Sequence, residues 1–293
     1  MLTHTFDSPQ KLARVVLLGG SGFVGQAIEA ALEKTNTPVK SFSSAELDLS
    51  AETAVDQLAG ELHKNDRLVI LSALTPDKGR DIATFMKNLK MIETVCAAVG
   101  KAPVQQIVYF SSDAVYPLGD SPVSEASAAA PADLYGAMHL ARELMLKDTA
   151  GDKLVVLRPT LIYGADDSHN SYGPNRFRRL AAKEGKITIG GKGEETRDHV
   201  FVEDVAEIVT LVLGHGSTGV LNVATGSSVD FGALAHMVAS LFGDGVEICP
   251  TERNMPVTHR HFDITATRKA FPEFQFASLE EGLRKAHKEF SDS

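Results

Sequence analysis

Three glycines near the start of the chain are spaced to bind a phosphate group. Gly19, Gly22 and Gly25 follow an apolar run and lead into an amphipathic, helix-like stretch. The first glycine permits a tight turn, the second lets backbone N–H groups approach a pyrophosphate, and the third allows a helix to pack closely on a strand. An ordinary glycine turn is the alternative, but this placement favours dinucleotide binding, with Phe23 and Val24 beside the phosphates.

The end of the next expected strand bears on which dinucleotide would bind. An Asp or Glu usually meets the free ribose 2′-hydroxyl of NAD, and Phe42-Ser43-Ser44 has no acid there. Ser43 and Ser44 could donate to the 2′-phosphate of NADP, although no Arg follows to balance its charge. We therefore expect NAD or NADP, with a slight preference for NADP. Asp48 is a candidate for an adenine contact, or equally a turn or helix-cap residue.

The elements that must position these residues alternate in type. Short β-branched runs alternate with longer helical patterns over residues 14–158, which is typical of parallel strands joined by crossover helices. A helix over residues 203–213 and a strand over 220–223 could rejoin the same sheet. The expected strands are apolar nearly throughout, as strands buried on both faces should be, and cover residues 14–18, 39–42, 67–71, 106–111 and 153–157.

Composition narrows the class of partner. The net charge of −9 over 293 residues, with scattered basic residues, argues against nucleic-acid binding. The two cysteines, Cys96 and Cys249, suggest neither a disulfide framework nor a metal site. No apolar run approaches the roughly 20 residues of a membrane helix. We expect a cytoplasmic protein with a small-molecule ligand, no metal, and no nucleic-acid or membrane partner.

Four further motifs follow the glycines in a fixed order. With the glycine loop they resemble the extended short-chain dehydrogenases/reductases, of the NAD-dependent epimerase/dehydratase type and the nucleotide-sugar branch, from residue 14 to about 283. The motifs that carry this resemblance are Tyr109–Tyr116, Tyr135–His139, Leu157–Gly164 and Arg197–Ala206.

The resemblance implies a fold of two lobes. The expected class is α/β, a doubly wound parallel Rossmann sheet with a smaller α/β substrate-binding lobe. The dinucleotide-binding domain would comprise residues 12–160 plus about 198–224. The substrate-binding lobe would comprise about 161–197 plus 225–293.

The resemblance also implies a catalytic pair. In that family a Ser or Thr and a Tyr bracket the reacting oxygen, so Tyr135 would move the proton and Ser112 would orient the carbonyl while hydride passes to or from the nicotinamide. Ser112 is preferred to Ser111 because it lies four residues before Tyr116, and alternation along the strand turns Ser111 to the opposite side. Asp113 completes the expected group. Simple turn-capping and helix-start roles are the alternatives.

His139 departs from the family pattern. The family places Lys four residues after the Tyr, on the same helix face, where it holds the nicotinamide ribose and lowers the Tyr pKa. The imidazole of His139 could bind the ribose and, when protonated, favour tyrosinate. Its titration would then show near the usual His pKa of about 6.5. A histidine that only fills a gap on the helix is the alternative.

Three residues are expected to contact the substrate. Asn175 and Arg197 stand where the resemblance implies nucleotide-sugar contacts, and Arg253 suits a second diphosphate-binding position, for which Arg260 competes. Paired guanidinium groups offer charge-assisted donors to phosphate oxygens. Family dehydratases carry Glu where this chain has Ala114, so dehydration is disfavoured.

We therefore expect an NAD(P)-dependent epimerase or reductase acting at the C4 carbonyl or hydroxyl of a nucleotide sugar. The alternatives are a catalytically weak NAD(P)-binding sensor or scaffold, and a reductase of a non-nucleotide carbonyl. Helical stretches over residues 85–99 and 135–147 have surplus apolar positions, and the matching pair in the family forms a dimer seam. A homodimer is expected.

Overall fold

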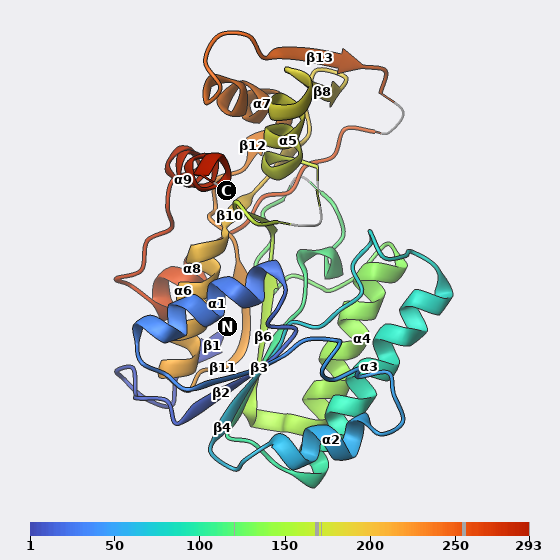
Figure 1. The fold of residues 1–293 in the computed structure, drawn as a ribbon, viewed down its shortest axis with the longest axis vertical. Helices are drawn as coiled ribbons and strands as arrows, with labels where there is room; N and C mark the ends of the chain where they lie inside the picture. Colours follow the sequence, from blue (N-terminus) through green and yellow to red (C-terminus); the bar gives the residue numbers. More distant parts are fainter. Residues whose placement is uncertain (120, 168–169, 171, 254–255, 293) are drawn as a thin grey trace.

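A seven-stranded sheet forms the centre of the molecule in the computed structural model, which describes residues 1–119, 121–167, 170, 172–253 and 256–292 (Figure 1). The strand order is β1-β11-β6-β5-β4-β2-β3, and every pairing is parallel except that of β1 with β11. The strands are β1 (Leu2–Thr3), β2 (Arg14–Leu18), β3 (Val39–Phe42), β4 (Asp66–Ile70), β5 (Gln106–Phe110), β6 (Leu154–Pro159) and β11 (Thr218–Val223).

Helices cover both faces of this sheet because its strands are apolar on both sides. On β2, Val15 and Leu17 pack into the core on one face, and Val16 and Leu18 pack on the other. The first face is covered by α1 (Phe23–Lys34), α6 (Val202–Gly214) and α8 (Thr265–Ala270). The second is covered by α2 (Ala54–Glu61), α3 (Ile82–Lys101) and α4 (Leu134–Ala150) (Figure 1).

This arrangement confirms the expected doubly wound α/β class. The strand expected over residues 220–223 is the end of β11 and joins the sheet beside β6. Expected strand boundaries differ from the observed ones by at most two residues, because ladder hydrogen bonds rather than side-chain types decide where a strand ends.

The strand order changes direction at β2. Its neighbours are β3 on one side and β4 on the other, so the connections that leave their carboxyl ends turn to opposite sides. A crevice opens at such a point, and in open α/β sheets ligands bind there. The glycine loop begins directly after β2, at the mouth of this crevice.

A smaller group of elements lies above the sheet in Figure 1, and we call it the upper lobe. Phe177, Ile187, Phe231 and Leu234 are buried in its own core. Its strands pair as β7 with β10, β8 with β13 and β9 with β12. The elements are β7 (Leu161–Tyr163), α5 (Pro174–Glu184), β8 (Lys186–Gly190), β9 (Thr196–Arg197), β10 (His199–Phe201), β12 (Val229–Asp230), α7 (Phe231–Ser240), β13 (Glu247–Thr251) and α9 (Leu279–Asp292).

A buried ion pair ties α4 to the central sheet. Arg158 on β6 donates to both carboxylate oxygens of Glu143 on α4, at 2.9 and 2.6 Å. Both side chains are less than one tenth exposed. Arg158 also donates to the hydroxyl of Tyr116, which in turn donates to Asn222. The network fixes α4 against the carboxyl ends of the strands.

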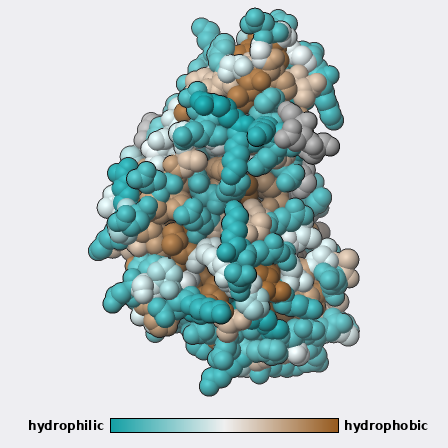
Figure 2. Space-filling model, turned by 60° about the vertical axis from the view of Figure 1, so that its left-hand side comes forward, coloured by the Kyte–Doolittle hydropathy of each residue, from teal (hydrophilic) through white to brown (hydrophobic). Residues whose placement is uncertain are grey.

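The face of the molecule shown in Figure 2 is mostly polar. Hydrophilic side chains cover most of it, and hydrophobic ones show between them in separate patches. Within the described residues, no helix is both long enough and apolar enough to cross a membrane.

Candidate active site

A cavity of about 710 Å³ follows the carboxyl ends of the central strands. The glycine loop forms part of its wall, with Phe23 and Val24 at the start of α1. The segment after β5 and the first turns of α4 line the same space, through Ser112, Asp113 and Tyr135. The expected cofactor loop and the expected catalytic pair therefore meet in one cavity.

The glycine loop is tightly packed against its own backbone. Gly19 has a φ of 92°, and a Cβ there would lie 3.0 Å from the backbone nitrogen of Ser72. A Cβ on Gly25 would lie 2.5 Å from the carbonyl oxygen of Gly20. Neither position can hold a larger residue without movement of the main chain, as expected for a phosphate-binding turn.

The helix start after this loop is suited to an anion. Gly22 is the N-cap of α1 and, within the described residues, no side chain caps the helix and no acid stands in its first turn. The first N–H groups of a helix need partners, and the helix dipole favours a negative charge beside them. These features fit the pyrophosphate of a dinucleotide.

An acid that the sequence analysis missed lies at the end of β3. The backbone N–H and the hydroxyl of Ser43 both donate to the Glu46 carboxylate, each at 2.8 Å. These hydrogen bonds hold the pKa of Glu46 below its usual value. The signal was the Ser-x-x-Glu spacing of a capping box. Asp48 is exposed and accepts hydrogen bonds from the N–H and hydroxyl of Ser50, the local turn role considered for it.

Close packing of α4 brings Tyr135 beside Ser112. Asp133 caps α4 by accepting from the N–H of Gly136 at 2.8 Å, which sets Tyr135 in the first turn. A Cβ on Gly136 would lie 2.1 Å from the carbonyl oxygen of Ala114. Glycine here lets the helix lie against the segment that carries Ser112, and the Ser112 hydroxyl comes near enough to Tyr135 to lower the pKa of its phenol.

The environment of Tyr135 keeps its phenol protonated. Burial, followed by the nearby Asp113 carboxyl, raises its pKa to about 12. The nearby Ser112 hydroxyl and the charge of Arg142 oppose this shift. Ser111 is occupied elsewhere, because its hydroxyl donates to Glu143 at 2.5 Å. This geometry supports the choice of Ser112 as the partner of Tyr135.

His139 lines the same cavity but is not charged. Its ring meets the Tyr135 ring edge to face, with the centroids 4.7 Å apart. Burial, with a smaller effect from Arg142, lowers the pKa of His139 to about 3. The expected titration near the ordinary His value is therefore wrong, because desolvation disfavours the imidazolium. Lysine chemistry cannot simply be transferred to this position.

A second cavity of about 970 Å³ borders the first, and Leu161, Tyr172 and Arg176 line both. Arg197 lines it and donates to the carbonyl oxygens of Thr196 and Thr258, at 2.8 and 2.7 Å. Within the described residues Arg197 has no carboxylate within 4.0 Å. Its charge is available to a ligand in this cavity.

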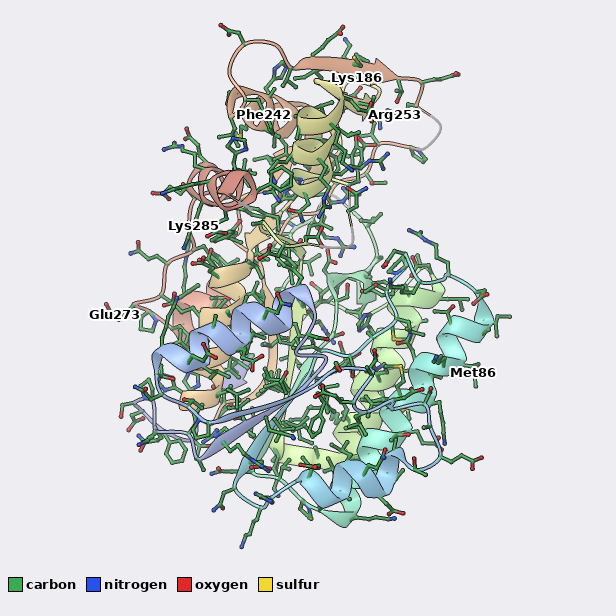
Figure 3. All side chains as sticks on the ribbon, in the orientation of Figure 1. Met86, Lys186, Phe242, Arg253, Glu273 and Lys285 are labelled. Atoms are coloured by element: carbon green, nitrogen blue, oxygen red, sulfur yellow. The ribbon has the colours of Figure 1, made fainter. Side chains whose placement is uncertain are left out.

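Arg253 lines the second cavity too, but it is already neutralised. Figure 3 labels it near β13 in the upper lobe. Its guanidinium forms ion pairs with Glu194 and Glu195 and donates to the Gly190 carbonyl oxygen at 2.9 Å. Its competitor Arg260 is buried with its Nε 4.0 Å from the Asp113 carboxylate. A diphosphate would have to displace two carboxylates from Arg253.

Arg176 is a cation that the sequence analysis did not select. It is exposed, it lines both cavities, and its guanidinium carbon lies 5.9 Å from the centre of the Tyr172 ring. The neighbouring Asn175, which was selected, lies buried in the wall instead. Its amide donates to Asp167 at 2.9 Å and accepts from the N–H of Gly164 at 3.2 Å. On α5 the flanking Asn175 and Phe177 are buried and Arg176 is exposed, a difference that the residue types alone do not indicate.

Comparison with known proteins places this geometry in a family. A family model described as "NAD dependent epimerase/dehydratase family" matches residues 15–224. An N-acetyl-alpha-D-glucosaminyl-diphospho-ditrans,octacis-undecaprenol 4-epimerase of Escherichia coli O157:H7 is 28% identical over 70% of this chain. That match spans 64% of the epimerase, less than two thirds of its length. A putative GDP-L-fucose synthase 2 of Oryza sativa subsp. japonica is 27% identical over 88% of this chain and 82% of its own.

Solved structures share the fold over nearly the whole chain. A UDP-N-acetylglucosamine 4-epimerase from Methanobrevibacter ruminantium M1 matches with a TM-score of 0.82 and 24% identity, over 97% of this chain and 99% of its own. A Thermus thermophilus UDP-glucose 4-epimerase in complex with NAD matches with a TM-score of 0.83 and 21% identity, over 96% and 99%. A Naegleria fowleri GDP-L-fucose synthetase bound to NADP matches with a TM-score of 0.83 and 15% identity, over 98% and 96%. From the family-model match over residues 15–224, this chain belongs to the NAD-dependent epimerase/dehydratase family.

Proposed function

We propose that the chain is an NAD(P)-dependent enzyme that transfers hydride to or from a sugar carbon of a nucleotide sugar. The carbon we propose is C4. One observation carries the proposal. The cavity that holds the glycine loop also holds the Ser112–Tyr135 pair, and it borders a second cavity lined by Arg176 and Arg197. Cofactor, reacting carbon and diphosphate would each have a place in continuous space.

The residues present fit a dinucleotide. The close backbone contacts at Gly19 and Gly25 leave room only for main chain, and the uncapped start of α1 suits the pyrophosphate. When bound, NAD(P) supplies or accepts the hydride. The Glu46 carboxylate on Ser43 would accept a hydrogen bond from a free ribose 2′-hydroxyl and repel a 2′-phosphate. It therefore favours NAD over NADP, against the preference that the sequence suggested.

Tyr135 would move the proton that accompanies the hydride. In the reducing direction its O–H proton passes to the substrate oxygen while hydride adds to the carbon. In the oxidising direction the substrate hydroxyl proton passes to the Tyr135 phenolate while hydride leaves. A Tyr135 pKa of about 12 means that the resting site holds the proton. Reduction is thus the direction for which the resting site is prepared, and an epimerase would first have to lower this pKa.

Arg176 and Arg197 are the cations we assign to the diphosphate. Charged guanidinium donors bind phosphate oxygens strongly in a partly buried site. Arg253, held by Glu194 and Glu195, would contribute only after those ion pairs open.

A homodimer through α3 and α4 is part of the proposal. Ile82 and Met86 on α3 are 71% and 55% exposed, and Leu144 on α4 is 60% exposed. Figure 3 shows Met86 on the outer side of α3, directed away from the sheet. Large apolar side chains grouped on one helix pair are typical of an interface between subunits.

The first experiment is a test of binding followed by turnover. We expect NAD or NADP, and then a nucleoside-diphosphate sugar, to raise the melting temperature, because a ligand that binds only the native state stabilises it. Tyr135→Phe should lower kcat roughly 100-fold or more, the range for loss of a general acid or base, and leave cofactor affinity unchanged.

Tyr163→Phe is the matched control. Tyr163 is also buried, but its hydroxyl donates weakly to the Leu279 carbonyl oxygen at 3.5 Å, away from both cavities. This variant should keep its activity. Equal rates for wild type and Tyr135→Phe would exclude Tyr135 as the proton donor. If neither NAD nor NADP changes the melting temperature, the proposal of an NAD(P)-dependent enzyme would be excluded.

A further inference from the structure

Three buried side chains lie together between α4 and β5, one to two helical turns after Tyr135. Tyr109 on β5 is 1% exposed, and His139 and Arg142 on α4 are 2% and 0% exposed. The Tyr109 hydroxyl oxygen lies 2.7 Å from His139 Nδ1. The Arg142 guanidinium carbon lies 5.2 Å from the centre of the Tyr109 ring. Tyr109 therefore contacts a neutral histidine with its hydroxyl and a cation with its face.

The hydrogen bond between Tyr109 and His139 defines which imidazole nitrogen carries the proton. Within the described residues the Tyr109 hydroxyl has no other acceptor. The 2.7 Å distance alone allows either group to be the donor. A buried O–H left without an acceptor costs about 1–3 kcal/mol, and Tyr109 does not line the first cavity, whereas His139 does and a ligand there can accept from Nε2. The Tyr109 O–H is therefore the donor to Nδ1. Burial raises the pKa of Tyr109, which keeps its proton in place. The single proton of neutral His139 must then be on Nε2.

Nε2 lies on the opposite side of the ring and has no partner among the described residues. His139 lines the first cavity together with Tyr135. A buried N–H without a partner costs free energy unless a ligand accepts its hydrogen bond. The His139 Nε2–H is thus a buried donor beside the cavity wall, whose hydrogen bond a bound cofactor or the oxygen of Tyr135 would complete.

Arg142 supplies a positive charge in the same place. It donates to the Ser72 carbonyl oxygen at 2.7 Å, and its Nε has no partner among the described residues. The adjacent carboxylate of Glu143 is taken by Arg158, so nothing neutralises Arg142 directly within the part of the chain described. Its charge opposes ionisation of His139 and favours ionisation of Tyr135.

We propose that these residues divide the work that one lysine does in the family motif. His139 donates the hydrogen bond from Nε2, and Tyr109 is a positioning residue that holds this tautomer. Arg142 is a second positioning residue, whose permanent charge favours the tyrosinate form of Tyr135. The inference rests on the proposed function for its catalytic meaning, but the tautomer can be measured without turnover.

The first test is nitrogen NMR of ¹⁵N-histidine-labelled protein, with His139→Gln to assign the signal. We expect a protonated Nε2 and an unprotonated Nδ1 at neutral pH, and a mixture of tautomers in Tyr109→Phe. A proton on Nδ1 in the wild type would overturn the inference whether or not the protein turns over a substrate. If the protein has the expected tautomer but turns over no substrate, the proposed function and the catalytic role of His139 would be refuted. The conclusion that Tyr109 fixes the His139 tautomer would stand.

The second test separates positioning from folding. Tyr109→Phe keeps the ring that packs on Arg142, and should lower kcat roughly 10-fold with cofactor affinity also reduced. The same change in a His139→Lys background should have less than a 2-fold effect, because a lysine has no tautomer to fix. Equal losses in both backgrounds would show a merely structural role for the Tyr109 hydroxyl.

The third test concerns the charge of Arg142. The charges that act most strongly on Tyr135 are those of Asp113, Arg142 and Asp133. Arg80 lines the same cavity but is exposed, so Arg142 is the buried cation among these groups. The alkaline limb of the pH–rate profile for oxidation should move up by about one pH unit in Arg142→Gln. It should return in Arg142→Lys, which keeps the charge and guards against loss of fold. An unmoved limb in Arg142→Gln would exclude the electrostatic role.

Discussion

Replacing Gly25 by alanine tests whether the contact between α1 and the glycine loop holds the cofactor site together. The added Cβ would lie 2.5 and 2.6 Å from the carbonyl oxygen and Cα of Gly20, and 2.7 Å from the carbonyl oxygen of Gly19. An ordinary contact needs 3.4 Å or more. All three neighbours are backbone atoms, so the loop itself must move by close to an ångström.

The expected magnitude follows from two opposing effects. Overpacking of this kind costs about 1–3 kcal/mol, and the better helix propensity of alanine returns up to about 1 kcal/mol. We expect Gly25→Ala to lose about 1–2 kcal/mol of unfolding free energy. Because the moved loop carries the N–H groups that we expect to bind the pyrophosphate, NAD(P) affinity should fall at least 10-fold, about 1.4 kcal/mol.

Urea unfolding and calorimetric titration with NAD and NADP measure the two effects separately. Gly60→Ala in α2 and Gly100→Ala in α3 are matched controls, because a Cβ at either position meets nothing within 4 Å. Each should gain a few tenths to about 1 kcal/mol of stability with unchanged affinity. Wild-type affinity in Gly25→Ala would refute the assignment of this loop to the dinucleotide.

Two further predictions concern stability. Glu143→Gln should lower the unfolding free energy by about 3–5 kcal/mol, because it leaves the Arg158 charge buried and uncompensated, whereas the double variant Glu143→Leu, Arg158→Met should lose less in urea unfolding. His139 and His199 have pKa values lowered to about 3 by burial, so below pH 6.5 the unfolded chain binds more protons than the folded one. Each histidine should therefore cost about 2 kcal/mol of stability between pH 7 and pH 5, partly offset by Asp204, whose pKa is raised to about 6. Unfolding of His199→Gln at both pH values should show a smaller loss, and an equal loss would contradict this account.

The fold could be predicted because its signals are local. A run such as Val15–Leu18 is apolar on both faces, and only a covered parallel strand uses that pattern well. The glycine spacing likewise predicts a tight turn from neighbouring residues alone, because the close contacts at Gly19 and Gly25 exclude every larger side chain. Each strand or helix can therefore be predicted from a short stretch of consecutive residues.

The site could be predicted only in part because its chemistry depends on partners far apart in the chain. The spacing from Tyr135 directs attention to position 139, but the charge state of His139 depends on burial and on Arg142. Its tautomer, in our proposal, depends on Tyr109 on β5. A motif gives the type of residue at a helical spacing. It does not give the solvent exposure of that side chain, on which its pKa depends. This is why the expected titration of His139 was wrong although its place in the cavity was right.

The same limit of sequence-based prediction applies to the arginines expected to bind the substrate. The sequence makes both Arg197 and Arg253 candidates for the diphosphate and does not show which anions lie beside each. In the structure, Glu194 and Glu195 neutralise Arg253. Arg197 is held by carbonyl oxygens and, among the described residues, has no carboxylate within 4.0 Å. A phosphate gains most from a cation that it does not have to take from another anion. We therefore expect the anions that the fold places next to each arginine to decide which of the two would hold a diphosphate, and we expect it to be Arg197.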